Sequence, residues 1–166
     1  MFMDEDQGEQ SPAMAAQSAG ILMYHHLGGE LRVLLVHPGG PYWRNKDAGA
    51  WSIPKGEYDA DEEPEAAARR EFAEELGFSA AGALLPLGEV RQRGGKRVTA
   101  FALEGDLDVT AIRSNEFQLE WPPGSGRMQS FPEVDRAAWL SLPAAAEKLL
   151  ASQLPFLDRL AEICAD

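Results

Sequence analysis

The alternation of apolar and polar residues in the first third of the chain predicts paired strands. Two apolar runs, SAGILMYHH at 18–26 and LRVLLVHP at 31–38, are separated by LGGE, whose two glycines favour a tight turn. The segment 38–50 is rich in Gly, Pro and charge and is therefore expected to be a loop. WSIP at 51–54 is expected to form a short strand. The pattern predicts a β-hairpin, a long loop and a strand before any helix.

The apolar spacing changes to the helical i, i+4 pattern after Asp61. We expect Asp61 to be the N-cap of this helix and Pro64 to be tolerated in its first turn. Gly77 is a stop signal for a helix. The apolar side of the predicted helix consists of Ala67, Ala68, Phe72 and Leu76.

The second half of the chain predicts more strands and two helical segments. A second hairpin turns at Gly94-Gly95, and strands are expected at 117–121 (FQLEW) and 134–142 (VDRAAWLSL), with a loop at 121–130 between them. Residues 143–163 are expected to be helical in two pieces broken near Pro155. Strands mixed with helices predict an α/β domain in which helices cover a mixed sheet.

Composition and charge restrict the function. A chain of 166 residues, 45% of them hydrophobic, fits one domain, assigned to residues 18–166 behind a disordered acidic tail at 1–17. A formal net charge of -12 argues against nucleic acid polymers as partners. No apolar run is long enough for a membrane span, and the acidic N-terminus lacks a signal-peptide pattern, so a cytoplasmic protein is expected. A small phosphorylated ligand stays possible, because a bound divalent metal inverts the local charge.

The acidic residues are concentrated around the predicted helix. Nine of the residues from Glu57 to Glu75 are Asp or Glu. Glu71, Glu74 and Glu75 stand at i, i+3 and i+4, on one helix face, where hard oxygen ligands would select Mg²⁺, Mn²⁺ or Ca²⁺. An exposed, solvated acidic helix has the same spacing, so this pattern alone leaves both interpretations open.

The whole segment resembles the Nudix box, G-x5-E-x7-R-E-U-x-E-E-x-G-U, in which U is bulky and apolar. Every fixed position of the box is present between Gly56 and Phe78. The matching residues are Gly56, Glu62, Arg70, Glu71, Phe72, Glu74, Glu75, Gly77 and Phe78. The resemblance to this family of hydrolases implies an α/β/α sandwich that cleaves diphosphates linked to another moiety, usually a nucleoside.

The resemblance also implies roles for the box residues. Glu71 and Glu75 would be the main Mg²⁺ ligands, with Mn²⁺ as a substitute, and Glu74 a further ligand or the base for water. The carbonyl of Gly56 would face the metal as well. Arg70 would orient the carboxylates, and Glu62 and Gly77 would be structural.

Residues outside the box add candidates for substrate binding and catalysis. Lys55 could meet a phosphate, and the sequence P-K-G resembles members that cleave dinucleoside tetraphosphates or diphosphoinositol polyphosphates. Further candidates for base stacking or phosphate contact are Tyr42, Trp43, Arg44, Arg91 and Arg93. A fourth carboxylate is expected from Glu116, Glu120 or Glu133. Glu133 is favoured because its place six residues before Trp139 resembles that of a catalytic loop Glu in the family.

We therefore expect a Mg²⁺-dependent hydrolase of a diphosphate linkage in a small nucleotide, either a nucleoside triphosphate or a dinucleoside polyphosphate. One alternative is a non-catalytic nucleotide sensor. Another is a hydrolase of ADP-ribose or a diphosphoinositol polyphosphate. An isopentenyl-diphosphate isomerase is disfavoured, because that chemistry relies on an active-site cysteine and Cys164 near the C-terminus is the one cysteine of the chain. The oligomeric state is left open.

Overall fold

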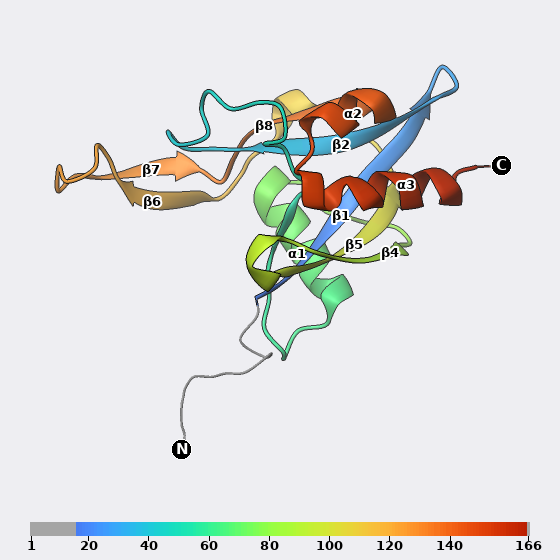
Figure 1. The fold of residues 1–166 in the computed structure, drawn as a ribbon, viewed down its shortest axis with the longest axis horizontal. Coiled ribbons are helices and arrows are strands. Elements are labelled where there is room, and N and C mark those ends of the chain that lie inside the picture. The colour runs from blue at the N-terminus through green and yellow to red at the C-terminus, as the bar shows by residue number, and fades with distance from the viewer. Residues whose placement is uncertain (1–15, 166) are drawn as a thin grey trace.

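The computed structural model of the chain describes residues 16–165 and forms three layers (Figure 1). The central layer is a six-stranded mixed sheet in the order β4-β5-β1-β2-β8, with β3 paired to β1. The strands of this sheet are β1 (Gln17–Leu27), β2 (Glu30–Pro38), β3 (Lys55–Glu57), β4 (Leu85–Arg91), β5 (Arg97–Glu104) and β8 (Val134–Ser141). The helices are α1 (Pro64–Leu76), α2 (Leu142–Lys148) and α3 (Leu154–Ile163), with short 3-10 turns at Arg93–Gly95, Val109–Ala111 and Ala151–Gln153.

The pairing of the strands confirms the mixed sheet and both expected hairpins. Strands β1 and β2 are antiparallel, with Leu27 opposite Glu30 at the turn. Strand β1 also runs parallel to β5 along residues 17–24, so the centre of the sheet is mixed. Strands β4 and β5 form the second antiparallel hairpin.

Period-two alternation along the central strands builds a separate core on each face of the sheet. Ile21 and Met23 of β1 point toward the face covered by α1, where they pack with Phe72. Leu22 and Tyr24 point to the opposite face, which α2 and α3 cover. The apolar side expected for α1, Ala67, Ala68, Phe72 and Leu76, is fully buried. The α/β/α arrangement is therefore a direct result of strands that are apolar on both sides.

The start of α1 differs from the expected one. The N-cap is Glu63, which makes no capping hydrogen bond through its side chain, and not Asp61. Pro64 explains the difference, because a residue before proline is driven into an extended conformation, and Glu63 has φ -72° and ψ 142°. The end is as expected: Gly77 closes the helix in the left-handed region at φ 77°.

Three other expectations about segments need correction. WSIP makes only isolated bridges, and the regular strand is β3, one residue beyond Pro54, which has no N–H to donate. The expected loop 121–130 ends in a strand, because Met128 already belongs to β7 (Met128–Pro132). The C-terminal helical region breaks at 149–153, and Pro155 stands in the first turn of α3.

Strands β6 (Glu116–Glu120) and β7 form a two-stranded sheet of their own. This hairpin extends away from the three-layer body, at the left of Figure 1. Strand β1 begins at Gln17, and residues 1–15 of the expected tail lie outside the described residues. In the described part of the chain, no helix is long and apolar enough to cross a membrane.

Candidate active site

Strand β3 brings the first residue of the box against the box helix. Its antiparallel pairing with β1 sets Gly56 opposite Ala19. In this position a Cβ atom on residue 56 would overlap the carboxylate of Glu71 on α1. A side chain on residue 56 would therefore displace the Glu71 carboxylate from its position against the backbone of β3.

Arg70 organises the carboxylates on the outer side of the helix. Its Nε and Nη2 donate to the two oxygens of Glu62, both at 2.8 Å. Its Nη1 donates to Glu71 at 2.5 Å and lies 3.4 Å from the nearer oxygen of Glu74. The bond from Arg70 lowers the pKa of Glu62. One guanidinium therefore bonds both Glu62 and Glu71 and restricts the positions of their carboxylates.

Glu75 lies on the inner side of the helix, in a less polar environment. Burial, followed by the nearby charges of Glu71 and Glu133, raises its pKa to about 8, although the positive charge of Lys55 acts in the opposite direction. Burial also raises the pKa of Glu71. The carboxylates of Glu71, Glu75 and Glu133 thus share one region and repel one another electrostatically.

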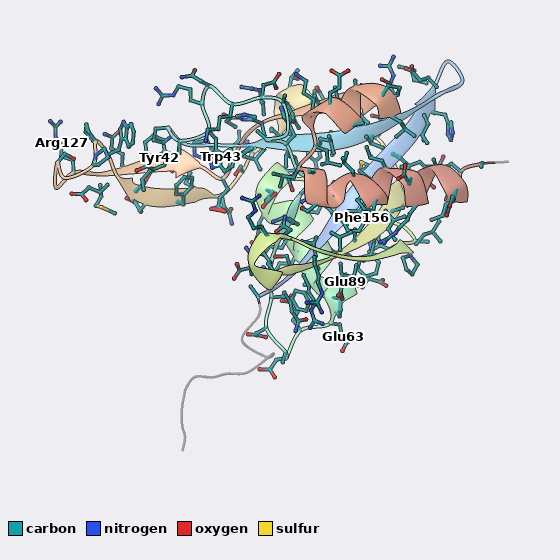
Figure 2. All side chains as sticks on the ribbon, viewed as in Figure 1. Tyr42, Trp43, Glu63, Glu89, Arg127 and Phe156 are labelled. Carbon is teal, nitrogen blue, oxygen red and sulfur yellow. The ribbon has the colours of Figure 1, made fainter. Side chains whose placement is uncertain are left out.

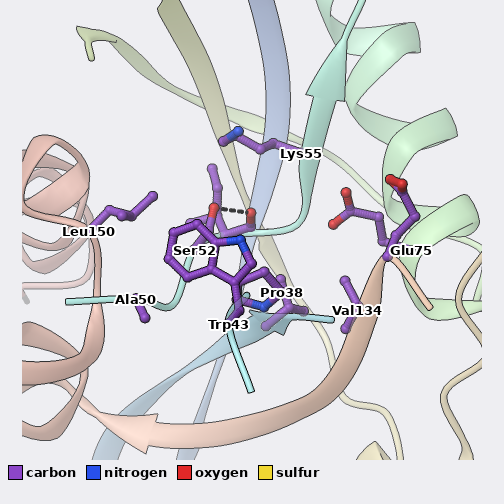
Figure 3. Close-up of a pocket in the computed structure, with 11 residues that line it drawn as sticks. Pro38, Trp43, Ala50, Ser52, Lys55, Glu75, Val134 and Leu150 are labelled. Atoms are coloured by element: carbon purple, nitrogen blue, oxygen red, sulfur yellow. Dashed lines mark hydrogen bonds between the residues drawn. The ribbon is translucent and has the colours of Figure 1, made fainter. Parts of the chain in front are cut away.

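Lys55 and two of these carboxylates line a pocket of about 200 Å³, here called the catalytic pocket. Its lining residues are Val36, Pro38, Trp43, Ala50, Ser52, Ile53, Lys55, Glu75, Glu133, Val134 and Leu150. Figure 3 shows Lys55 and Glu75 on different elements, with the Trp43 ring in the centre of the view. Burial and the charge of Lys96 lower the pKa of Lys55. Four separate segments thus converge on one small volume.

Glu133 reaches this pocket through a series of backbone hydrogen bonds. Asn115 N–H donates to the carbonyl of Glu74 in α1 at 2.9 Å, and Glu133 N–H donates to the carbonyl of Asn115 at 2.8 Å. The backbone carbonyl of Glu133 in turn accepts from Gly39 N–H at 3.0 Å. The box helix, the base of the β6–β7 hairpin and the loop after β2 are therefore tied together at Glu133.

The other two candidates for a fourth carboxylate are placed differently. Glu120 accepts from Gly126 N–H at 2.7 Å inside the β6–β7 hairpin. Glu116 is exposed and faces Pro132 across the same hairpin. Neither lines the catalytic pocket, so this geometry favours Glu133.

A second pocket of about 320 Å³, here called the side pocket, opens between the loop after β2 and the hairpin. It is lined by Pro38, Gly39, Gly40, Pro41, Tyr42, Trp43, Phe117, Leu119 and Glu133. Tyr42 packs edge-on against Trp121 of the hairpin, with ring centroids 5.3 Å apart. Figure 2 shows Tyr42 and Trp43 beside the hairpin and Arg127 at its far end.

The donor set suits a hard divalent cation, although the side chains are not gathered around one point. Within residues 16–165, no group of three or more His, Cys, Asp or Glu side chains is close enough to hold a metal. Arg70 engages Glu71 and Glu74. The nearby donors are carboxylate oxygens, which Mg²⁺ prefers, and a cation would offset the burial and the repulsion from Glu71 and Glu133 that raise the pKa of Glu75. The residues present therefore fit such an ion.

Some candidates from the sequence do not reach either pocket. Arg44, Arg91 and Arg93 are exposed and line neither one. Arg93 lies in a 3-10 turn beyond the end of β4, so strand alternation does not place it beside Arg91.

Phe117 and Leu119 are pocket residues that were not among the candidates from the sequence, although their i, i+2 spacing in the expected strand 117–121 puts both on one face. They line the side pocket. The buried His37 has a structural role. It lies 2.9 Å from Asp135 and 2.6 Å from the carbonyl of Lys46. His37 thereby attaches the far end of the 38–50 loop to the sheet.

Known structures share this fold at low sequence identity. An Ap4A hydrolase of C. elegans, solved as a binary complex, is 20% identical, with 89% of this chain and 98% of that chain covered and a TM-score of 0.63. The NUDIX domain of Shewanella oneidensis NrtR, complexed with ADP ribose, is 18% identical, with coverages of 91% and 89% and a TM-score of 0.62. A MutT protein from Methanosarcina mazei Go1 is 22% identical, with coverages of 92% and 96% and a TM-score of 0.58.

A family model that matches most of the chain identifies the family. No curated protein matches the sequence. The family model described as NUDIX domain matches residues 14–160, which include the complete box and Glu133. The chain therefore belongs to the Nudix family, whose hydrolases are pyrophosphohydrolases that act on phosphorus anhydrides.

Proposed function

We propose that this protein is a Mg²⁺-dependent pyrophosphohydrolase that cleaves a diphosphate linkage in a nucleoside polyphosphate. The observation that carries the proposal is the convergence of Lys55, Glu75 and Glu133 on the catalytic pocket, beside a Glu71 that Arg70 and Gly56 hold in place. The full set of box carboxylates favours an enzyme over a sensor that binds without cleaving.

Each residue has a role that follows from its position. Glu71 and Glu75 would hold Mg²⁺, which, when bound, neutralises diphosphate oxygens and activates water. Glu133 enters from a different element and would accept the proton of the attacking water. Lys55 would bind a phosphate oxygen as a point charge. Arg70 is a positioning residue, because its contacts are with Glu62, Glu71 and Glu74.

The proposal also includes a class of substrate. We expect a nucleotide with at least three phosphates, with dinucleoside polyphosphates preferred over ADP-ribose. Lys55 is the cation that the catalytic pocket offers to such a phosphate chain, and Lys96, which pairs with Glu57 at 3.0 Å, would have to leave that carboxylate to provide a second one. An Ap4A hydrolase and an ADP-ribose complex resemble this fold about equally, so fold similarity does not choose between these substrates.

A substrate screen with Mg²⁺ tests this proposal. Nucleoside triphosphates, dinucleoside polyphosphates, ADP-ribose and diphosphoinositol polyphosphates would be assayed for released phosphate, pyrophosphate and nucleotide, with excess EDTA as the control. We expect hydrolysis that EDTA abolishes, with the highest kcat/KM for a nucleotide of three or more phosphates. The highest kcat/KM for ADP-ribose would overturn the substrate class, and binding without any hydrolysis would favour the sensor.

A further inference from the structure

The side pocket differs from the catalytic pocket in its chemistry. Three aromatic rings, those of Tyr42, Trp43 and Phe117, line it together with Leu119. It has no Lys or Arg in its lining, and its one charged residue is Glu133. Tyr42 and Trp43 keep 56% and 37% of their surface exposed, so parts of both side chains are free to contact a ligand.

The two pockets adjoin each other. Pro38, Trp43 and Glu133 line both of them. A ligand that leaves the catalytic pocket on this side therefore enters the side pocket past Glu133. Because the two linings share these residues, one extended molecule can occupy both pockets.

Charge determines which part of such a molecule each pocket takes. A phosphate would meet the carboxylate of Glu133 in the side pocket, whose lining has no Lys or Arg to compensate. Lys55 and the proposed metal ligand Glu75 line the catalytic pocket and not the side pocket. Flat, uncharged rings bind well between aromatic and aliphatic side chains. We propose that the side pocket binds the nucleobase of the substrate while its phosphates occupy the catalytic pocket. This inference rests on the proposed function, which supplies the phosphates.

The hairpin that forms the outer wall is built to present an apolar face. Phe117 and Leu119 are half-buried on its inner side, while Gln118 on its outer side donates to Ser130 Oγ at 2.6 Å. Phe131 is paired with Phe117 across the hairpin and lies beside it on the same face, with ring centroids 6.0 Å apart. An isolated two-stranded hairpin is only marginally stable in water. Here its base is bonded to α1 through Asn115, and Tyr42 packs on Trp121.

Phe117 and Leu119, the residues of the hairpin wall, lie outside both hydrophobic cores. Neither Phe117 nor Leu119 is part of the cluster on either face of the main sheet. Truncating them should therefore leave the folded body intact and change the side pocket alone. Stacking on an aromatic side chain changes the affinity for a base by about 5- to 150-fold, which sets the size of the expected effect.

The test uses two probes that differ only in the base and contain no diphosphate to cleave. AMP and ribose 5-phosphate would be titrated into the full chain with Mg²⁺, and their dissociation constants measured by calorimetry or NMR. We expect AMP to bind the wild type at least about fivefold tighter. Phe117→Ala and Leu119→Ala should each remove most of this advantage, whereas Gln118→Ala on the outer face of the same strand should keep it.

Two results would overturn the base subsite: equal affinities of the two probes for the wild type, or an undiminished preference for AMP in Phe117→Ala. If Phe117→Ala fails to fold, Leu119→Ala and Tyr42→Ala decide in the same way. The same experiments can refute the proposed function independently of the base subsite. A preference for AMP that depends on Phe117, in a protein that hydrolyses none of the screened diphosphates, would refute the hydrolase and keep the subsite.

Discussion

In the Nudix box, Arg70 donates to Glu62 and Glu71 at 2.5–2.8 Å and the loop backbone at Gly56 presses against Glu71. Across the catalytic pocket, at the hairpin, two ring pairs pack together: Tyr42 with Trp121 at 5.3 Å, and Phe117 with Phe131 at 6.0 Å between centroids. Charge-assisted hydrogen bonds have a defined length and direction, whereas ring pairs pack over a range of centroid distances.

The difference between these two regions separates two tasks. Catalysis on a diphosphate needs charges held in place before the substrate arrives. Recognition of a base needs a flat apolar surface that can adapt to its occupant. Changes in the box should therefore lower kcat, and changes in the hairpin wall should weaken binding. The following predictions test that separation, beginning with the largest effect.

Glu75→Gln should keep the fold and lower kcat by a hundredfold or more, because it removes a carboxylate that would hold the metal and stabilise charge in the transition state. Steady-state kinetics with Mg²⁺ and a melting curve would measure both effects. Glu63→Gln is the matched control, since Glu63 is exposed at the start of the same helix and makes no capping bond. Full activity of Glu75→Gln would refute the proposed role of the box.

Glu133→Gln should lower kcat by about tenfold to a hundredfold, with a smaller change in KM and little change in Tm. Glu133 stands where the two pockets meet, since it lines both the catalytic pocket and the side pocket. Glu120→Gln is the control on the hairpin, where Glu120 bonds Gly126. A loss of kcat in Glu120→Gln, together with wild-type kinetics in Glu133→Gln, would reverse the assignment.

The two neighbouring arginines of α1 should separate orientation from stability. Arg70→Lys should lower kcat about tenfold with a small change in Tm, because an ammonium cannot bond Glu62 and Glu71 as a guanidinium does. Arg69 donates to the carbonyls of Ala80 and Gly82, so Arg69→Lys should lower Tm and leave kcat nearly unchanged. The same response in both variants would show that Arg70 is merely structural.

The pH dependence of stability should reveal the burial of Glu75. Without metal, its pKa is about 8 in the folded protein, compared with an ordinary value of 4.5. Below about pH 4.5 both the folded and unfolded states carry the proton. As pH rises toward 8 the unfolded state loses it first, so the free energy of unfolding falls and then levels off above pH 8.

Melting curves in EDTA from pH 5 to 9 would measure this change. Glu75→Gln has no proton to lose, so its Tm advantage over the wild type should grow up to about pH 8. Mg²⁺ should raise the wild-type Tm more than NaCl of equal ionic strength does, because it binds the ionised, folded form. Parallel curves for the wild type and Glu75→Gln in EDTA would show that Glu75 is not buried as described.

The sequence determined the features that depend on neighbours along the chain. Helical spacing places Ala67, Ala68, Phe72 and Leu76 in the core, and Gly77 ends α1. Alternation along β1 and β2 gives both faces of the sheet. The prediction of Asp61 as the N-cap of α1 was wrong, but the actual start also has a local cause, since Pro64 forces Glu63 into an extended conformation.

The tertiary structure alone decided which distant residues meet. Glu133 reaches Glu75 through backbone bonds that involve Asn115 and Glu74, and backbone groups bond in the same way whatever side chain they carry. For the same reason no periodicity revealed that Trp43 and Phe117 line one pocket, or that Arg44 and Arg93 line neither. Local patterns fix which face a side chain occupies, and the pairing of remote segments fixes what that face meets.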